Sequence, residues 1–181
     1  LTMCYHAVKH HMSFSSLDCT TKLRSKIFND SKTAKNVSLG RTKATPVVKS
    51  ILAPDTTKQI CEDLESVHYF GIATDASNHG AEKIFPLIVQ YFTVKNGLTV
   101  KVLKLDSLKN ETAIQISSYC VNALEENNID KCKGIAFCGD NANTNVGGVR
   151  RSGTNNVFVK FKTELNENLL GVGCSAHNAQ R

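Results

Sequence analysis

Two short apolar segments each end in an aspartate, and this pair constrains the fold more than any other feature of the chain. The first segment reads YFGIATD (residues 69–75), and the second reads GIAFCGD (residues 134–140). Because alternate residues of a strand share a face, Asp75 and Asp140 each lie above small residues at the carboxyl end of a strand. If these strands are parallel neighbours, the two carboxylates meet and need a cation or a proton between them. A hard divalent metal ion is the usual solution.

Each aspartate also has a simpler interpretation, as the cap of the turn that follows its strand. The segments DASN (residues 75–78) and DNAN (residues 140–143) are typical turn sequences. The residues alone support a shared metal site and two turn caps about equally.

The remaining apolar segments predict a mixed sheet covered by helices. We expect strands at residues 68–75, 85–94, 98–105, 133–139 and 169–174, and helices at residues 111–127 and 155–165. Asn96-Gly97 predicts a two-residue hairpin between the second and third strands. The order is therefore β-β-β-α-β-α-β. With a right-handed crossover this order gives a mixed sheet, and the crossover that brings the fourth strand beside the first would align Asp75 with Asp140.

The first third of the chain carries all of its excess positive charge. Residues 1–60 hold ten Lys or Arg against three Asp, a net charge of +7, whereas residues 61–181 have a net charge of −1. We expect helices at residues 17–28 and 41–52, the latter ended by Pro54, and a short helix at residues 60–64. The predicted domains are a basic helical segment (residues 1–66) and the sheet (residues 67–181). Such asymmetry indicates a nucleic-acid partner, the alternative being a solvated basic segment without one.

Two further motifs are weaker signals. Cys174-Ser-Ala-His177 could supply two of the four ligands that zinc needs, or a buried thiol and a packing histidine. Arg150 and Arg151, in the glycine-rich segment 147–153, could contact phosphate, or this segment could simply connect two elements. Seven cysteines without a secretory signal indicate reduced thiols inside a cell. No apolar run is long enough for a membrane helix, so no membrane partner is expected.

Taken together, these segments resemble the ribonuclease-H-like core of hAT-superfamily transposases and of the host genes derived from them. The resemblance depends on four segments of the predicted sheet domain: FGIATDASNHG (70–80), FPLIVQYF (85–92), GDNAN (139–143) and CSAHN (174–178). The upstream segments HMSFSSLDC (11–19) and RTKA (41–44) resemble the helical region that precedes that core. The resemblance covers nearly the whole chain.

The resemblance implies a nuclear cut-and-paste DNA transposase with a D-D-E site for Mg²⁺ or Mn²⁺. By position, Asp75 matches the first carboxylate and Asp140 the second, and both would be catalytic metal ligands. Cys174 and His177 match the family's C-x-x-H motif, which lies near the active site and the target DNA. Family members also carry a zinc finger that reads the DNA ends and a dimerisation region, so homo-oligomers would form through regions outside this chain.

The chain departs from the family pattern at the third carboxylate. In the family, this glutamate follows a large helical insertion after C-x-x-H, whereas the sequence ends four residues beyond His177. A tryptophan that often follows the first aspartate is also missing. We therefore expect an incomplete transposase core without catalytic activity. The alternative is a transposase-derived module that binds DNA or protein without catalysis.

A third interpretation is a different ribonuclease-H-like nuclease. Exonucleases of this fold carry Asp-x-Glu on the first strand, which Asp75-Ala76-Ser77 does not match. Ribonuclease H itself places a glutamate on the first helix. Glu111 lies near the start of that predicted helix and Glu125 and Glu126 near its end, and none of the three is clearly placed by the sequence.

Overall fold

The structure is a computed structural model that describes residues 1–80, 82–140, 142–147 and 153–174. The chain divides into two compact units, Leu1–Lys58 and Gln59–Arg181. The two units are described separately below.

The N-terminal unit is helical. Its helices are α1 (Thr2–Lys9), α2 (Phe14–Ile27), α3 (Lys32–Asn36) and α4 (Arg41–Val47), followed by a π-helical turn, η1 (Val48–Leu52). Serine side chains cap two of them, because the hydroxyl of Ser13 accepts a hydrogen bond at the start of α2 and that of Ser31 does so at the start of α3. A small core holds the unit together and consists of Cys4, Ala7, Leu17 and Ala44.

The expectation that Pro54 ends a helix was wrong. Helix α5 (Ala53–Ser66) follows η1 without a break, and Pro54 lies in its first turn. Proline cannot donate a hydrogen bond and its ring crowds the preceding turn. The π turn η1, which is wider than an α-helical turn, lies directly before this position, and Pro54 therefore does not end the helical segment.

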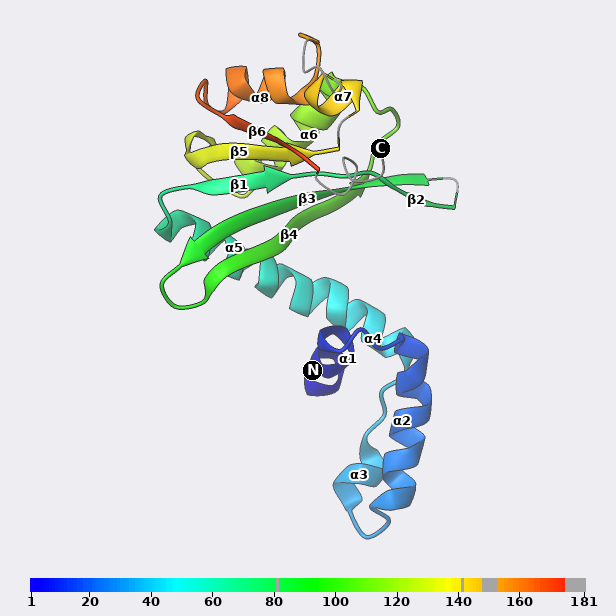
Figure 1. Cartoon of the computed structure of the whole chain (residues 1–181). Coiled ribbons are helices and arrows are strands. Elements are labelled where there is room, and N and C mark those ends of the chain that lie inside the picture. The colour runs from blue at the N-terminus through cyan, green and yellow to red at the C-terminus, as the bar shows by residue number, and fades with distance from the viewer. Residues whose placement is uncertain (81, 141, 148–152, 175–181) are drawn as a thin grey trace. The chain divides into compact units, whose positions relative to one another are not determined.

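The C-terminal unit is built on a single mixed sheet. In the described residues its strands are β1 (Phe70–Ala73), β2 (Ser77–His79), β3 (Glu82–Thr93), β4 (Gly97–Ser107), β5 (Gly134–Gly139) and β6 (Leu170–Gly173). Strand β3 pairs antiparallel with β1, β2 and β4, whereas β5 pairs parallel with both β1 and β6. Figure 1 shows β6, β5, β1, β3 and β4 side by side in this order from top to bottom.

The hairpin between β3 and β4 differs from the expected two-residue turn. Its loop is Val94–Asn96, and Gly97 follows with φ +69°. A positive φ is accessible to glycine because it has no Cβ, which explains the Asn-Gly signal. The three-residue loop is the next most common hairpin connection.

Helices cover one face of the sheet. They are α6 (Ala113–Glu126), the short α7 (Asn143–Val146) and α8 (Val157–Glu164), and they lie together at one end of the unit in Figure 1. Phe137 of β5 meets Phe161 of α8 edge-to-face, with ring centroids 5.0 Å apart. The C-terminal half of α5 contributes Ile60 and Leu64 to the same core. The core therefore lies between this face and the helices.

The opposite face of the sheet is largely bare. Val100 and Val102 of β4 are 58% and 52% exposed, and Leu170 of β6 is 63% exposed. The β3 residues buried in the core alternate with more exposed ones, as a sheet covered on one side requires.

The chain is therefore a mixed α/β protein, with the expected order of long elements. Strands β1 and β5 are parallel neighbours, as predicted. The elements α1, α3, β2 and α7 were not predicted. Of these, α3, β2 and α7 have five residues or fewer, which is too few to show a hydrophobic period. Within the described residues, no helix is long and apolar enough to span a membrane.

Candidate metal site

Asp75 and Asp140 follow two paired strands at the same edge of the sheet. Ala73 pairs with Cys138, and the amide of Thr74 donates a hydrogen bond to the carbonyl oxygen of Cys138 at 3.2 Å. The same register, continued for two residues, places Asp75 opposite Asp140. Both side chains line one cavity of about 110 Å³. The structure thus brings together the two carboxylates that the sequence singles out.

Asp140 is held by the turn that follows β5. Its Oδ1 accepts hydrogen bonds from the amide of Ala142 at 3.0 Å and from the Nδ2 group of Asn145 at 2.6 Å. This is the turn cap that was the alternative interpretation of Asp140. The cap uses Oδ1 and does not remove the carboxylate from the cavity, so the two interpretations are compatible.

Gly139 allows Asn145 to approach Asp140. A Cβ atom at position 139 would lie 3.2 Å from the Cβ of Asn145 and 3.0 Å from Cζ of Phe137. Both distances are shorter than ordinary contacts between carbon atoms. The glycine therefore lets α7 pack closely against the end of β5.

Two further oxygen atoms in the cavity have no hydrogen-bond partner. Thr74 is 3% exposed and its Oγ1 is unpaired, and Oδ1 of Asn145 is buried and unpaired as well. Both residues line the cavity with the two aspartates. Buried polar atoms are almost always hydrogen-bonded, and an unpaired one needs an explanation such as a bound ion or water. The cavity thus offers oxygen donors from carboxylate, hydroxyl and amide groups.

An ion pair lies at the wall of the same cavity. Nζ of Lys83, on β3, lies 2.5 Å from Oε2 of Glu111, which precedes α6. Both residues line the cavity. The described lining residues therefore include three carboxylates and one ammonium group, a net charge of −2.

The nearby thiols do not favour a soft metal. Burial, the neighbouring Cys174 and Asp75 together raise the pKa of the Cys138 thiol, which keeps it protonated at neutral pH. Cys174 follows β6, and its amide donates to the carbonyl oxygen of Gly139 at 3.0 Å. In the described part of the chain, no group of three or more His, Cys, Asp or Glu side chains is arranged to hold a metal ion. This holds for the carboxylates too, so a cation in the cavity would depend on Asp75 and Asp140 together with the oxygen atoms of Thr74 and Asn145, which are donors that suit a hard ion.

Three of the predicted site residues cannot be placed. Arg150, Arg151 and His177 lie outside the described residues. Cys174 is placed beside the end of β5, near Cys138, but its expected partner His177 is not available for comparison.

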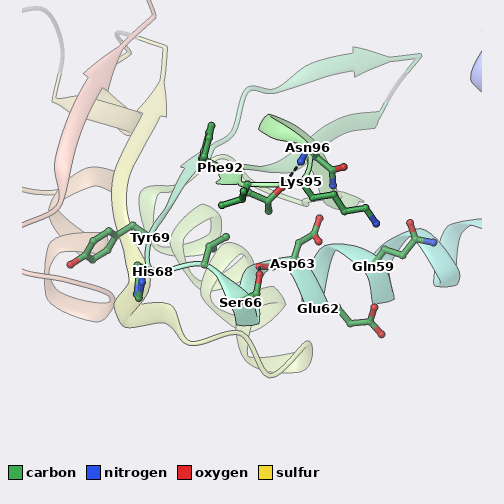
Figure 2. Close-up of a pocket in the computed structure, with 12 residues that line it drawn as sticks. Gln59, Glu62, Asp63, Ser66, His68, Tyr69, Phe92, Lys95 and Asn96 are labelled. Carbon is green, nitrogen blue, oxygen red and sulfur yellow. Dashed lines mark hydrogen bonds between the residues drawn. The ribbon is translucent and has the colours of Figure 1, made fainter.

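A larger groove lies at the other end of the sheet. It has a volume of about 930 Å³, and Figure 2 shows side chains of α5, such as Asp63, facing the β3–β4 turn with Lys95 and Asn96. The hydroxyl group of Tyr91 donates to Oδ2 of Asp63 at 2.9 Å. Burial, together with this hydrogen bond and the charge of Asp63, raises the pKa of Tyr91 to about 12. None of the groove residues lines the carboxylate cavity, so this groove is a separate feature.

Comparison with known proteins adds no assignment. No protein-family model matches the chain, and no curated protein matches it significantly.

Sequence reasoning missed Thr74, Asn145 and Lys83. Thr74 directly precedes the first strand-end aspartate, and Asn145 lies in the turn after the second. Neither position is a signal in the sequence, and only the pairing of the two strands brings both residues to one cavity. Lys83 carries no local signal, because its partner Glu111 is 28 residues away in the chain.

Proposed function

We propose that Asp75 and Asp140 bind a divalent cation, Mg²⁺ or Mn²⁺, in the ribonuclease-H-like core of a DNA-processing protein related to hAT transposases. The observation that carries this proposal is the cavity itself. Two strand-end carboxylates share it with two unpaired buried oxygen atoms, those of Thr74 and Asn145. Oxygen donors around a net negative charge are what a hard divalent cation requires.

The order and direction of the strands support the ribonuclease-H-like part of the proposal. An antiparallel hairpin is followed by two parallel strands reached through helical connections, and both aspartates lie at the carboxyl ends of neighbouring strands. The carboxyl edge of parallel strands is where α/β proteins most often place their ligands.

Four residues of the cavity have a role in this proposal. Asp75 and Asp140 bind the cation, and Asn145 orients Asp140 through the 2.6 Å hydrogen bond. Thr74 offers its hydroxyl oxygen from the buried side. When bound, the cation would polarise a phosphodiester and activate the attacking hydroxyl or water.

We do not expect residues 1–181 to cleave DNA by themselves. Two carboxylates face the cavity without a basic partner among the described residues, whereas Glu111 is neutralised by Lys83. Two-metal phosphoryl-transfer sites depend on several carboxylates. Binding of the cation without efficient strand cleavage is the expected behaviour.

DNA is the proposed partner because of the basic N-terminal unit. Its exposed lysines include Lys22 and Lys26 on α2 and Lys32 and Lys35 on α3. Phosphate contacts by such residues would give affinity without sequence selectivity. This surface also supports the second candidate function, a DNA-binding module that has kept the fold without the chemistry.

Titration with Mn²⁺ tests the proposed site. Calorimetry should detect one site whose affinity falls by about tenfold or more in Asp75→Asn, since cation affinity depends on the number of charged ligands. Asp106→Asn is the matched control, because Asp106 is an exposed aspartate of the same sheet that does not line the cavity. Equal affinities for the wild type and Asp75→Asn would contradict the proposal.

A further inference from the structure

We propose that Glu111 is a third acidic ligand of the cation site and that Lys83 competes with the cation for it. This inference rests on the proposed function, because it extends the donor set of the same cavity. Removing Lys83 should therefore tighten the site, and the gain should depend on Glu111.

The location of the Lys83–Glu111 pair supports this role. Both residues line the carboxylate cavity and also a neighbouring groove of about 810 Å³. The ion pair thus forms a wall common to the two spaces. Thr112 caps α6 directly beside Glu111, so binding of the cation by Glu111 requires its side chain to rotate from Lys83 towards the aspartates of the same cavity.

The charge of the cavity favours a cation. The described lining residues carry a net charge of −2, and Lys83 is the single positive group among them. Its ammonium group contacts Glu111, so the carboxylates of Asp75 and Asp140 have no basic partner within the described residues. One divalent cation would balance this charge.

The unpaired oxygen atoms provide an independent observation. The Oγ1 atom of Thr74 is buried without a partner in the wall of the same cavity, and so is Oδ1 of Asn145. A carboxylate cluster alone would be satisfied by protonation, whereas the buried amide oxygen of Asn145 needs a donor or a cation, and the Thr74 hydroxyl can donate or accept or bind a cation through its oxygen.

The ion pair is weak enough to be displaced. The Lys83 and Glu111 side chains are 33% and 52% exposed, and ion pairs at such exposure contribute little because water screens them. A divalent cation held by Asp75 and Asp140 offers Glu111 twice the charge of the ammonium group.

The first test compares Mn²⁺ affinities by calorimetry in the full chain. Lys83→Met should bind Mn²⁺ about tenfold more tightly than the wild type, following the dependence of affinity on ligand charge. The double variant Lys83→Met/Glu111→Gln should lose this gain. The control pair is Lys104–Glu126, which also joins a strand lysine to a glutamate at 2.6 Å with similar exposure, 30% and 59%. Lys104→Met should leave the affinity unchanged.

The second test separates a ligand from a nearby charge. In the Lys83→Met background, Glu111→Cys should shift the preference of the site from Mn²⁺ towards Cd²⁺, because a thiolate prefers the softer ion. Glu126→Cys in the same background should not shift it. Circular dichroism of each variant checks that the fold is retained. We expect it to be retained, because the substituted side chains are partly exposed.

The outcomes distinguish this inference from the function on which it rests. Loss of Mn²⁺ binding in Asp75→Asn, with equal affinities for Lys83→Met and the double variant and no Cd²⁺ shift, overturns Glu111 as a ligand and leaves the aspartate site intact. An Mn²⁺ affinity that is the same in the wild type and in Asp75→Asn overturns both proposals.

Discussion

The Nδ2 group of Asn145 donates a 2.6 Å hydrogen bond to Oδ1 of Asp140, and this contact fixes one of the two strand-end carboxylates. It joins the short helix α7 to the end of β5. The Oδ1 atom of the same asparagine is buried and has no hydrogen-bond partner. Asn145 therefore orients Asp140 through its Nδ2 group and leaves its own oxygen atom free to accept a contact.

Asn145→Ala should loosen Asp140 and weaken cation binding. Loss of an outer-shell hydrogen bond to a metal ligand typically lowers affinity by about tenfold or more. The free energy of unfolding should fall by about 1 kcal/mol from the lost hydrogen bond. Calorimetry with Mn²⁺ and urea denaturation measure the two effects.

The control for this substitution is Asn127→Ala. Asn127 donates from Nδ2 to the carbonyl oxygen of Ala123 at 2.8 Å and lies outside the cavity. It should lower stability without changing the affinity for Mn²⁺. Equal effects of both variants on affinity would show that Asn145 does not position Asp140.

Gly139→Ala should destabilise the fold and displace α7. The added Cβ would lie 3.2 Å from the Cβ of Asn145, so overpacking should cost about 1–3 kcal/mol. Gly71→Ala is the matched control on β1, because its nearest neighbour would be the Cβ of Ala136 at 3.8 Å. Urea denaturation compares the two, and equal losses of stability would argue against close packing behind Asp140.

Tyr91 should make the fold sensitive to alkaline pH. Burial and Asp63 raise the pKa of Tyr91 to about 12, above the value of about 10 expected in the unfolded chain. Between these values the unfolded chain loses its proton first, so the free energy of unfolding falls as the pH rises from about 10 towards 12. Below pH 10 this contribution is fully present.

Tyr91→Phe removes this titration. Its free energy of unfolding should fall less steeply than that of the wild type across the same pH range, after a loss of about 1 kcal/mol at neutral pH from the missing hydrogen bond. Urea denaturation at successive pH values measures both. Parallel curves for the two proteins would contradict the role of Tyr91.

DNA binding by the basic N-terminal unit should depend steeply on salt. Lys22→Gln/Lys26→Gln should lower the slope of log affinity against log salt by about 0.9 for each lysine that contacts phosphate. Fluorescence anisotropy with a short duplex measures the slope. Lys95→Gln/Lys101→Gln neutralises two exposed lysines of the sheet and should change it less. An affinity that is independent of salt would remove DNA as the partner of this surface.

A plasmid-nicking assay tests the expected lack of catalysis. With Mg²⁺ or Mn²⁺, residues 1–181 should not convert supercoiled plasmid to the open-circular form above background. Nicking that disappears in Asp75→Asn would refute this expectation and show that the cavity is a competent active site.

The sequence was sufficient to predict the strands that are marked by an apolar run. The apolar runs before Asp75 and Asp140 predicted β1 and β5, and the hypothesis that these strands are parallel neighbours is confirmed by their pairing. Pro54 predicted the end of a helix, but this prediction was wrong, because Pro54 lies in the first turn of α5, directly after the π turn η1.

The sequence by itself determined most of the strands and helices, because periodic burial is a local property, and it placed Asp75 and Asp140 at the carboxyl ends of two of these strands. Only the tertiary structure decided that Thr74 and Asn145 leave buried oxygen atoms unpaired, and that Lys83 reaches Glu111 across 28 positions of the chain. Such contacts depend on which side chains packing brings together, and no residue carries that information alone.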